Sequence, residues 1–165
     1  MGFDVDTINM IDCETDERFM RQALELAREA AAEGEVPVGA VIVRDGTVIA
    51  TGRNRREEGR QALAHAEIEA IYGACAALGG WRLSGCTLYV TLEPCPMCAG
   101  AIINARIDRV VYGAPDPKAG SCGSLTDLFG MPFNHQPLCD GGVLEEACAG
   151  VLRDFFRTLR QQRGG

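Results

Sequence analysis

The strongest constraint on the fold of this chain is that two short segments, far apart in sequence, have to meet. One is His-Ala-Glu at residues 65–67, and the other is Pro-Cys-Pro-Met-Cys at residues 94–98. One imidazole and two thiolates suit a tetrahedral zinc ion, and three ligands leave its fourth position open, as catalytic zinc sites do. We therefore expect His65, Cys95 and Cys98 to hold one Zn²⁺ per subunit.

The spacing within each segment predicts where it lies in the secondary structure. Cys95 and Cys98 are three residues apart, so at the start of a helix they share one face. Pro96 suits the first helical position. His65 and Glu67 would point to opposite sides inside a helix, so they can share a site only in a first turn. Both halves of the site are thus predicted at helix N-termini, whose dipole favours thiolates.

Glu67 is the carboxylate that remains beside the predicted metal site. Zinc acidifies water toward a pKa of about 7, and a nearby carboxylate can accept the proton and later protonate a leaving amine. The pattern predicts hydrolytic removal of an amine from a ring carbon, with Glu67 as the catalytic residue. Two core cysteines spaced by chance and a redox Cys-x-x-Cys pair are the alternatives, and neither requires the residues at 65–67.

Hydrophobic patterning predicts the fold. Buried strands are expected at 36–43 and 86–92. Further strands are expected at 47–52, after an Asp-Gly hairpin turn at 45–46, and at 109–113. Helices are expected from Thr15 or Asp16 to about residue 33, from about His65 to Leu78, from Pro96, and from Glu145. Residues 114–142 are expected to form active-site loops with one helical turn near Leu125. This order predicts an α/β fold with three layers, α/β/α, and a mixed sheet of about five strands flanked by helices.

The net charge of −7 is unevenly distributed. Residues 1–15 lack periodicity and are predicted to form a flexible acidic N-terminal arm, followed by a single domain over residues 16–163. Residues 1–17 contain six acidic and no basic residues, so the remainder is nearly neutral. Basic patches can therefore exist at residues 53–60 and in the C-terminal helix. Ordinary solvated surfaces are the alternative interpretation of these arginines.

Compartment and membrane association can also be predicted. No run of about 18 apolar residues occurs, so we expect no membrane span, and the first residues lack the basic region of a secretory signal. Eight cysteines at irregular spacing then indicate reduced thiols and a cytoplasmic protein. The six cysteines outside the motif are expected to be free and mostly buried.

Beyond the two motifs, the chain resembles the bacterial tRNA-specific adenosine deaminases, the TadA family of the zinc-dependent cytidine and deoxycytidylate deaminase superfamily. The zinc motif alone is shared with cytidine, guanine and riboflavin-pathway deaminases. The narrower resemblance covers about residues 16–160 and depends on flanking segments in the same order. These are Val36–Val41, Gly52–Arg55, Ala64–Glu67, Thr91–Cys95, Met97–Ile102, Asp116–Gly120 and Asn134-His135.

The resemblance implies a cytidine-deaminase-like fold, a zinc deaminase domain, and conversion of adenosine to inosine at the wobble position of a tRNA anticodon. It also implies a homodimer that binds a splayed anticodon stem-loop and takes one unstacked base into its pocket. By position, Asn54 would hydrogen-bond the purine, the backbone around Ala66 would help hold it, and Glu35 would support the pocket edge.

Further positions are implied as contacts to the RNA backbone. Asp116 and Lys118 would lie near the ribose-phosphate of the flipped base, with Asn134 and the C-terminal arginines farther along the loop. Asp116-Pro117 is also a good turn in its own right. The chain departs from the family at residues 61–63 (Gln-Ala-Leu), where a polar, proline-containing stretch is common, and at Arg56, where a proline is expected.

Two other functions remain open on sequence grounds. One is deamination of a free base or nucleoside, such as guanine or cytidine, in a closed pocket. The other is a zinc-stabilised RNA-binding module without chemistry. Turnover of an RNA substrate should fall with rising salt, which distinguishes a tRNA deaminase from the first alternative. Replacing Glu67 should abolish ammonia release in a deaminase and change nothing in the second alternative.

Overall fold

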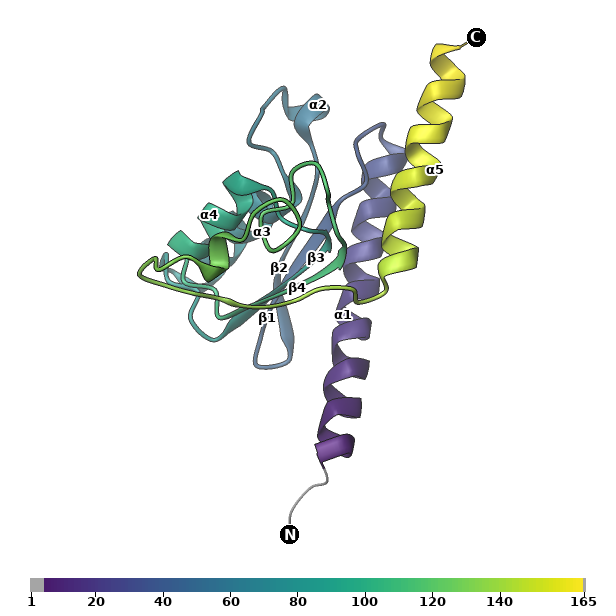
Figure 1. The fold of residues 1–165 in the computed structure, drawn as a ribbon. Coiled ribbons are helices and arrows are strands. Elements are labelled where there is room, and N and C mark those ends of the chain that lie inside the picture. Colours follow the sequence, from purple (N-terminus) through teal and green to yellow (C-terminus); the bar gives the residue numbers. More distant parts are fainter. Residues whose placement is uncertain (1–4, 165) are drawn as a thin grey trace.

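The computed structural model describes residues 5–164, and the side chains of residues 12–164 (Figure 1). The helices are α1 (Val5–Ala32), α2 (Arg56–Gly59), α3 (Ala66–Leu78), α4 (Pro96–Asn104) and α5 (Glu145–Arg163), with a short 3₁₀ helix η1 (Leu128–Gly130). The strands are β1 (Gly39–Arg44), β2 (Thr47–Arg53), β3 (Cys86–Leu92), β4 (Arg109–Ala114) and β5 (Leu138–Asp140). No helix in this range is both long enough and apolar enough to cross a bilayer.

The five strands form one mixed sheet in the order β2-β1-β3-β4-β5. β1 is antiparallel to β2 and to β3, whereas β3, β4 and β5 are parallel. The hairpin between β1 and β2 turns at Asp45 and Gly46, with φ angles of 51° and 74°. Positive φ at both positions is what a two-residue Asp-Gly hairpin requires. The prediction of a mixed sheet of about five strands is confirmed.

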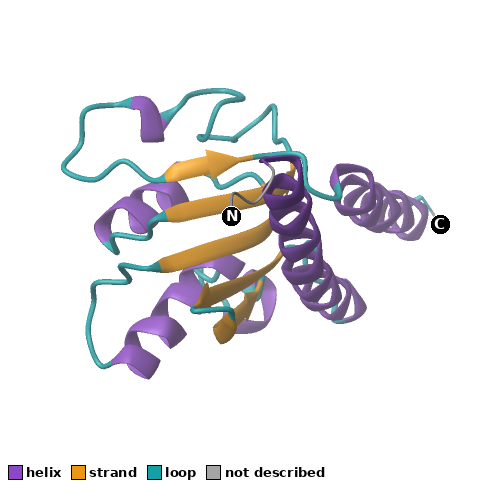
Figure 2. Cartoon of the chain, turned by 90° about the horizontal axis from the view of Figure 1, so that it is seen from below, coloured by secondary structure: helices purple, strands orange, loops and turns teal. Residues whose placement is uncertain are grey.

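Helices cover both faces of the sheet, so the predicted three-layer α/β/α architecture is also confirmed (Figure 2). Along β1 the side chains alternate between two buried clusters. Ala40 and Ile42 lie in the cluster that includes residues of α3 and α4, whereas Val41 and Val43 face α1 and α5. At Gly52 a Cβ would overlap the carbonyl oxygen of Ala66. This close approach of β2 and α3 fixes the N-terminus of α3.

Helix α1 differs from the sequence prediction. It begins at Val5, so the predicted start at Thr15 or Asp16 is wrong, and residues 1–4 of the predicted arm lie outside the described residues. No glycine or proline occurs between residues 3 and 33, and acidic residues favour a helix N-terminus. Asp16 is therefore not a cap but a buried residue, which accepts hydrogen bonds from Tyr89 Oη (2.8 Å) and from both terminal nitrogens of Arg109.

The segment 114–142 contains more regular structure than predicted. β5 extends the sheet beyond β4, and the single helical turn is η1, three residues beyond the predicted position at Leu125. Asp127 caps η1 by accepting a hydrogen bond from the Gly130 N–H (3.2 Å). A three-residue strand is too short to show periodicity, so the pattern could not reveal β5.

Candidate active site

The two predicted segments meet at the starts of α3 and α4. His65 precedes the first residue of α3, Cys95 precedes the first residue of α4, and Cys98 lies in the first turn of α4. His65 Nδ1 is 3.6 Å from Cys95 Sγ and 3.5 Å from Cys98 Sγ. The three donor atoms lie within 4.8 Å of one another. The predicted placement of both halves at helix N-termini is confirmed.

The protonation of these donors indicates that the site fits a divalent cation. A hydrogen bond from the Cys98 thiol, followed by one from His65, lowers the pKa of Cys95 to about 4. The same contact between the sulfurs, together with burial, raises the pKa of Cys98 far above its usual value. Two neighbouring thiolates repel each other unless a positive charge lies between them. A metal ion supplies this charge and replaces the protons that the donor atoms otherwise share. A His/Cys/Cys set with this geometry suits zinc with one open position.

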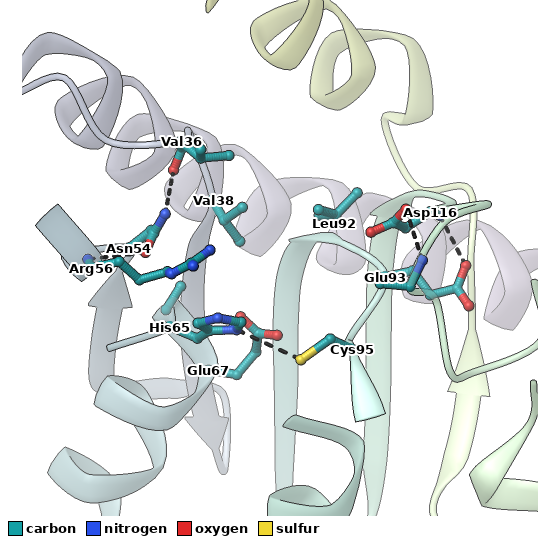
Figure 3. A pocket seen from close by; sticks show the side chains of 12 residues that line it. Val36, Val38, Asn54, Arg56, His65, Glu67, Leu92, Glu93, Cys95 and Asp116 are labelled. Carbon is teal, nitrogen blue, oxygen red and sulfur yellow. Dashed lines mark hydrogen bonds between the residues drawn. The ribbon is translucent and has the colours of Figure 1, made fainter. Parts of the chain in front are cut away.

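Glu67 lies in the first turn of α3 beside these donors (Figure 3). Its side chain is 3 % exposed, and burial raises the pKa of its carboxyl above the usual value. Its Oε1 is the one buried side-chain oxygen or nitrogen among residues 12–164 without a hydrogen-bond partner. Buried polar atoms rarely lack partners, so this oxygen is available to a molecule that enters the site.

A cavity of about 220 Å³ opens at this point (Figure 3). It is smaller than the roughly 300–1,000 Å³ of pockets for drug-sized ligands, so it suits one small ring system. Apolar side chains form much of its wall, with the polar groups of the site at its base. The lining residues are Val36, Val38, Asn54, Arg56, His65, Ala66, Glu67, Leu92, Glu93, Cys95, Asp116 and Ala119.

Two predicted substrate contacts, Asn54 and Ala66, line this cavity. Asn54 is buried, and its amide donates to the carbonyl of Val36 (3.2 Å) and accepts from the N–H of Arg56 (3.3 Å). Glu35 lies behind the same edge and accepts hydrogen bonds from two backbone N–H groups at the start of α2. These contacts hold the edge of the cavity that Glu35 was expected to support.

The three residues predicted to contact the RNA backbone do not all lie at the cavity. Asp116 lines the cavity, but its Oδ1 accepts from the N–H of Lys118 (3.0 Å) and of Ala119 (3.3 Å), as expected for a turn. Lys118 is exposed and lies in an adjoining groove, and Asn134 is exposed outside the cavity. The structure thus brings Asp116 to the metal donors and leaves Lys118 and Asn134 away from them.

Glu93 is a site residue that the sequence analysis did not assign. It lines the cavity, is 2 % exposed, and accepts hydrogen bonds from the N–H groups of Asp116, Cys122 and Ser124 and from the Ser124 hydroxyl. Burial alone would raise its pKa, but these hydrogen bonds lower it below the usual value. Its position directly after the buried strand β3 was the available signal. Glu93 fixes the loop that closes one side of the cavity.

We expect Glu93→Gln to reduce kcat/KM on the proposed substrate by about ten- to a hundredfold. The loop that Glu93 holds would shift, and a shift of about 1 Å in the cavity wall misaligns the reacting groups. The NH2 group of the glutamine cannot accept hydrogen bonds from the backbone N–H groups that the carboxylate of Glu93 satisfies. We therefore also expect the free energy of unfolding to fall by about 1–3 kcal/mol. Kinetics and urea unfolding measure both. Zinc content should not change, and Glu25→Gln, on exposed helix surface, is the matched control. Unaltered kcat/KM in Glu93→Gln would show that this loop does not position the substrate.

Comparison with known proteins agrees with this geometry. The family model of the MafB19-like deaminases matches residues 14–160. The tRNA-specific adenosine deaminase of Bacillus subtilis (strain 168) is 52% identical over 149 residues, which cover 90% of this chain and 92% of that protein.

Solved structures give the same result. A structure from biochemical and structural studies of A-to-I editing by tRNA:A34 deaminases superimposes with a TM-score of 0.80 and 51% identity, covering 82% of this chain and 99% of that one. A structure of guanine deaminase from Nitrosomonas europaea has a TM-score of 0.71 and 30% identity, covering 84% of this chain and 83% of that one. The chain therefore belongs to the MafB19-like deaminase family, and within it to the tRNA-specific adenosine deaminases.

Proposed function

We propose that this protein catalyses the hydrolytic deamination of adenosine to inosine at the wobble position of a tRNA anticodon. The observation that carries the proposal is the partnerless Glu67 oxygen, which faces a small cavity beside a His/Cys/Cys donor set. The similarity to tRNA-specific adenosine deaminases over 90% of the chain supports adenosine in tRNA as the substrate.

The metal in this proposal is one zinc ion per subunit, held by His65, Cys95 and Cys98. When bound, zinc supplies a Lewis acid that makes water a nucleophile near neutral pH. With these three residues as its protein ligands, a zinc ion would keep one position for water or substrate.

Glu67 moves the protons of the reaction. Its carboxylate takes one proton from the attacking water and delivers it to a ring nitrogen of the base. It then takes the second proton from the same oxygen, which becomes the carbonyl, and delivers it to the leaving amine. A carbon–oxygen bond forms, the carbon–nitrogen bond breaks, and ammonia leaves with a carbonyl in its place. The raised pKa of the buried Glu67 suits a group that has to hold and release a proton. Asn54 and the Ala66 backbone hold the purine at the cavity wall.

The substrate is an anticodon stem-loop with one unstacked base, since a paired base could not enter the cavity. Asp116, Lys118 and Asn134 contact the ribose-phosphate backbone outside it.

We also propose a homodimer, supported by exposed apolar side chains that a second copy would cover. These include Leu125, Met131, Phe133 and Leu138. Eight free cysteines support a reducing, cytoplasmic location.

The second candidate is a deaminase of a free base, which the similarity to the N. europaea guanine deaminase favours. Incubation of the zinc-loaded protein with an anticodon stem-loop carrying wobble adenosine, and separately with free adenosine, cytidine and guanine, decides between the two. We expect inosine only in the stem-loop, measured by mass spectrometry of digested RNA. A stem-loop with guanosine at the wobble position is the control. A product from a free base and none from RNA would contradict the proposal.

A further inference from the structure

A groove of about 970 Å³ adjoins the active-site cavity. Val36, Arg56, Leu92 and Asp116 line both, so the two form one continuous depression. The groove leads from the cavity to α5. Its remaining lining residues are Pro115, Pro117, Lys118, Leu152, Arg153, Asp154, Phe156, Arg157 and Arg160. The lining of the groove thus carries five cationic and two acidic side chains, a balance that favours an anionic ligand.

Arg56 lines both the cavity and the groove, and its guanidinium differs from those of Arg53 and Arg55 in its ion pairing. The Arg53 guanidinium forms an ion pair with Glu33 (3.0 Å), and the Arg55 guanidinium pairs with Glu69 (3.0 Å). Among residues 12–164, no carboxylate forms an ion pair with Arg56. A guanidinium without a carboxylate partner can bind an incoming anion without first losing an ion pair.

The backbone at Arg56 is held in place by buried groups. Glu35, 2 % exposed, accepts from the N–H groups of Glu57 (2.9 Å) and Glu58 (2.9 Å), and Asn54 Oδ1 accepts from the N–H of Arg56. Figure 3 shows the Arg56 side chain extending from the Asn54 edge over the cavity, near His65 and Val38. Because the backbone is held at this point, any adjustment of Arg56 to a ligand would take place in its side chain.

We propose that Arg56 binds the phosphate next to the nucleoside that enters the cavity, and thereby selects a polynucleotide over free nucleosides. The inference rests on the proposed function. A base seated in a cavity of this size leaves its ribose and flanking phosphates at the mouth, where Arg56 lies. The planar guanidinium donates two parallel hydrogen bonds to a phosphate.

The first test is Arg56→Gln, with Arg60→Gln as the matched control. Arg60 lies next to α2 and lines neither cavity. For Arg56→Gln we expect kcat/KM on the stem-loop to fall about tenfold, mainly through KM, and its logarithm to depend less steeply on log salt, by about 0.7–1. Arg60→Gln should match the wild type, and zinc content should be equal in all three proteins. Equal slopes and rates for Arg56→Gln and the wild type would overturn the inference.

The second test locates the contact. A methylphosphonate replaces the phosphate on the 5′ or the 3′ side of the target adenosine and so removes one charge. At one of the two positions, the wild type should lose about as much kcat/KM as Arg56→Gln does, and Arg56→Gln should lose nothing further. Equal losses for both proteins at both positions would refute the contact while leaving the deaminase activity intact. Absence of inosine from the wild-type reaction would instead overturn the proposed function and this inference with it.

Discussion

Glu67→Gln is expected to slow ammonia release from a wobble-adenosine stem-loop by at least about 10³-fold, near the upper part of the 10²–10⁴ range for general acid–base groups. The glutamine amide has nearly the shape of the carboxyl group but cannot carry a proton between water, ring nitrogen and leaving amine. In the proposed mechanism every proton transfer uses this one buried carboxylate. Ammonia release under single-turnover conditions measures the effect.

The matched control for this variant is Glu69→Gln. Glu69 lies on the same helix, where it pairs with Arg55 outside the cavity, so its replacement should change turnover less than about twofold, as expected for a partly exposed ion pair. Both variants should retain one zinc per chain. A zinc-stabilised RNA-binding module without chemistry requires that Glu67→Gln changes nothing measurable, and that result would reject the proposed mechanism.

Cys98→Ala is expected to abolish zinc binding and with it the activity. Cys98 is fully buried and is one of the three proposed zinc ligands. The wild type should gain about 4 kcal/mol in the free energy of unfolding when free zinc is a thousandfold above its Kd. Cys98→Ala should lose this gain. Metal analysis and urea unfolding with zinc or with chelator measure both effects.

The chain offers a matched control in Cys86→Ala. Cys86 is also fully buried, but it lies at the start of β3, at the opposite end of that strand from the site. Its replacement should lower stability through lost packing and leave zinc content at one equivalent. A Cys98→Ala protein that still holds a full equivalent of zinc would refute the assigned ligands.

Features that depend on neighbouring residues in the sequence were predictable. The Asp-Gly turn, the buried strand at residues 86–92 and the helix after Pro96 all follow from short-range chemistry, and the structure confirms them. The placement of His65 and of the two cysteines at helix starts follows in the same way from the spacing within each segment. The meeting of the two segments was predicted instead from the ligands that zinc prefers.

Features that depend on tertiary neighbours were not predictable. Asp16 has the sequence context of a helix cap, yet its partners are Tyr89 on β3 and Arg109 on β4. The position of Glu93 after a buried strand was a signal in the sequence, but its hydrogen bonds to the loop from Asp116 to Ser124 depend on the tertiary structure. The predicted contacts of Lys118 and Asn134 depend on an RNA strand that extends beyond the cavity, and they stay predictions.

The proposed function depends on a single zinc ion with three protein ligands and one open position. X-ray absorption at the zinc edge of the purified protein tests it directly. We expect two sulfur neighbours at about 2.3 Å, one imidazole nitrogen at about 2.0–2.1 Å and one further light atom. Four sulfur neighbours, a shell of nitrogen and oxygen alone, or less than a stoichiometric amount of zinc would contradict the account.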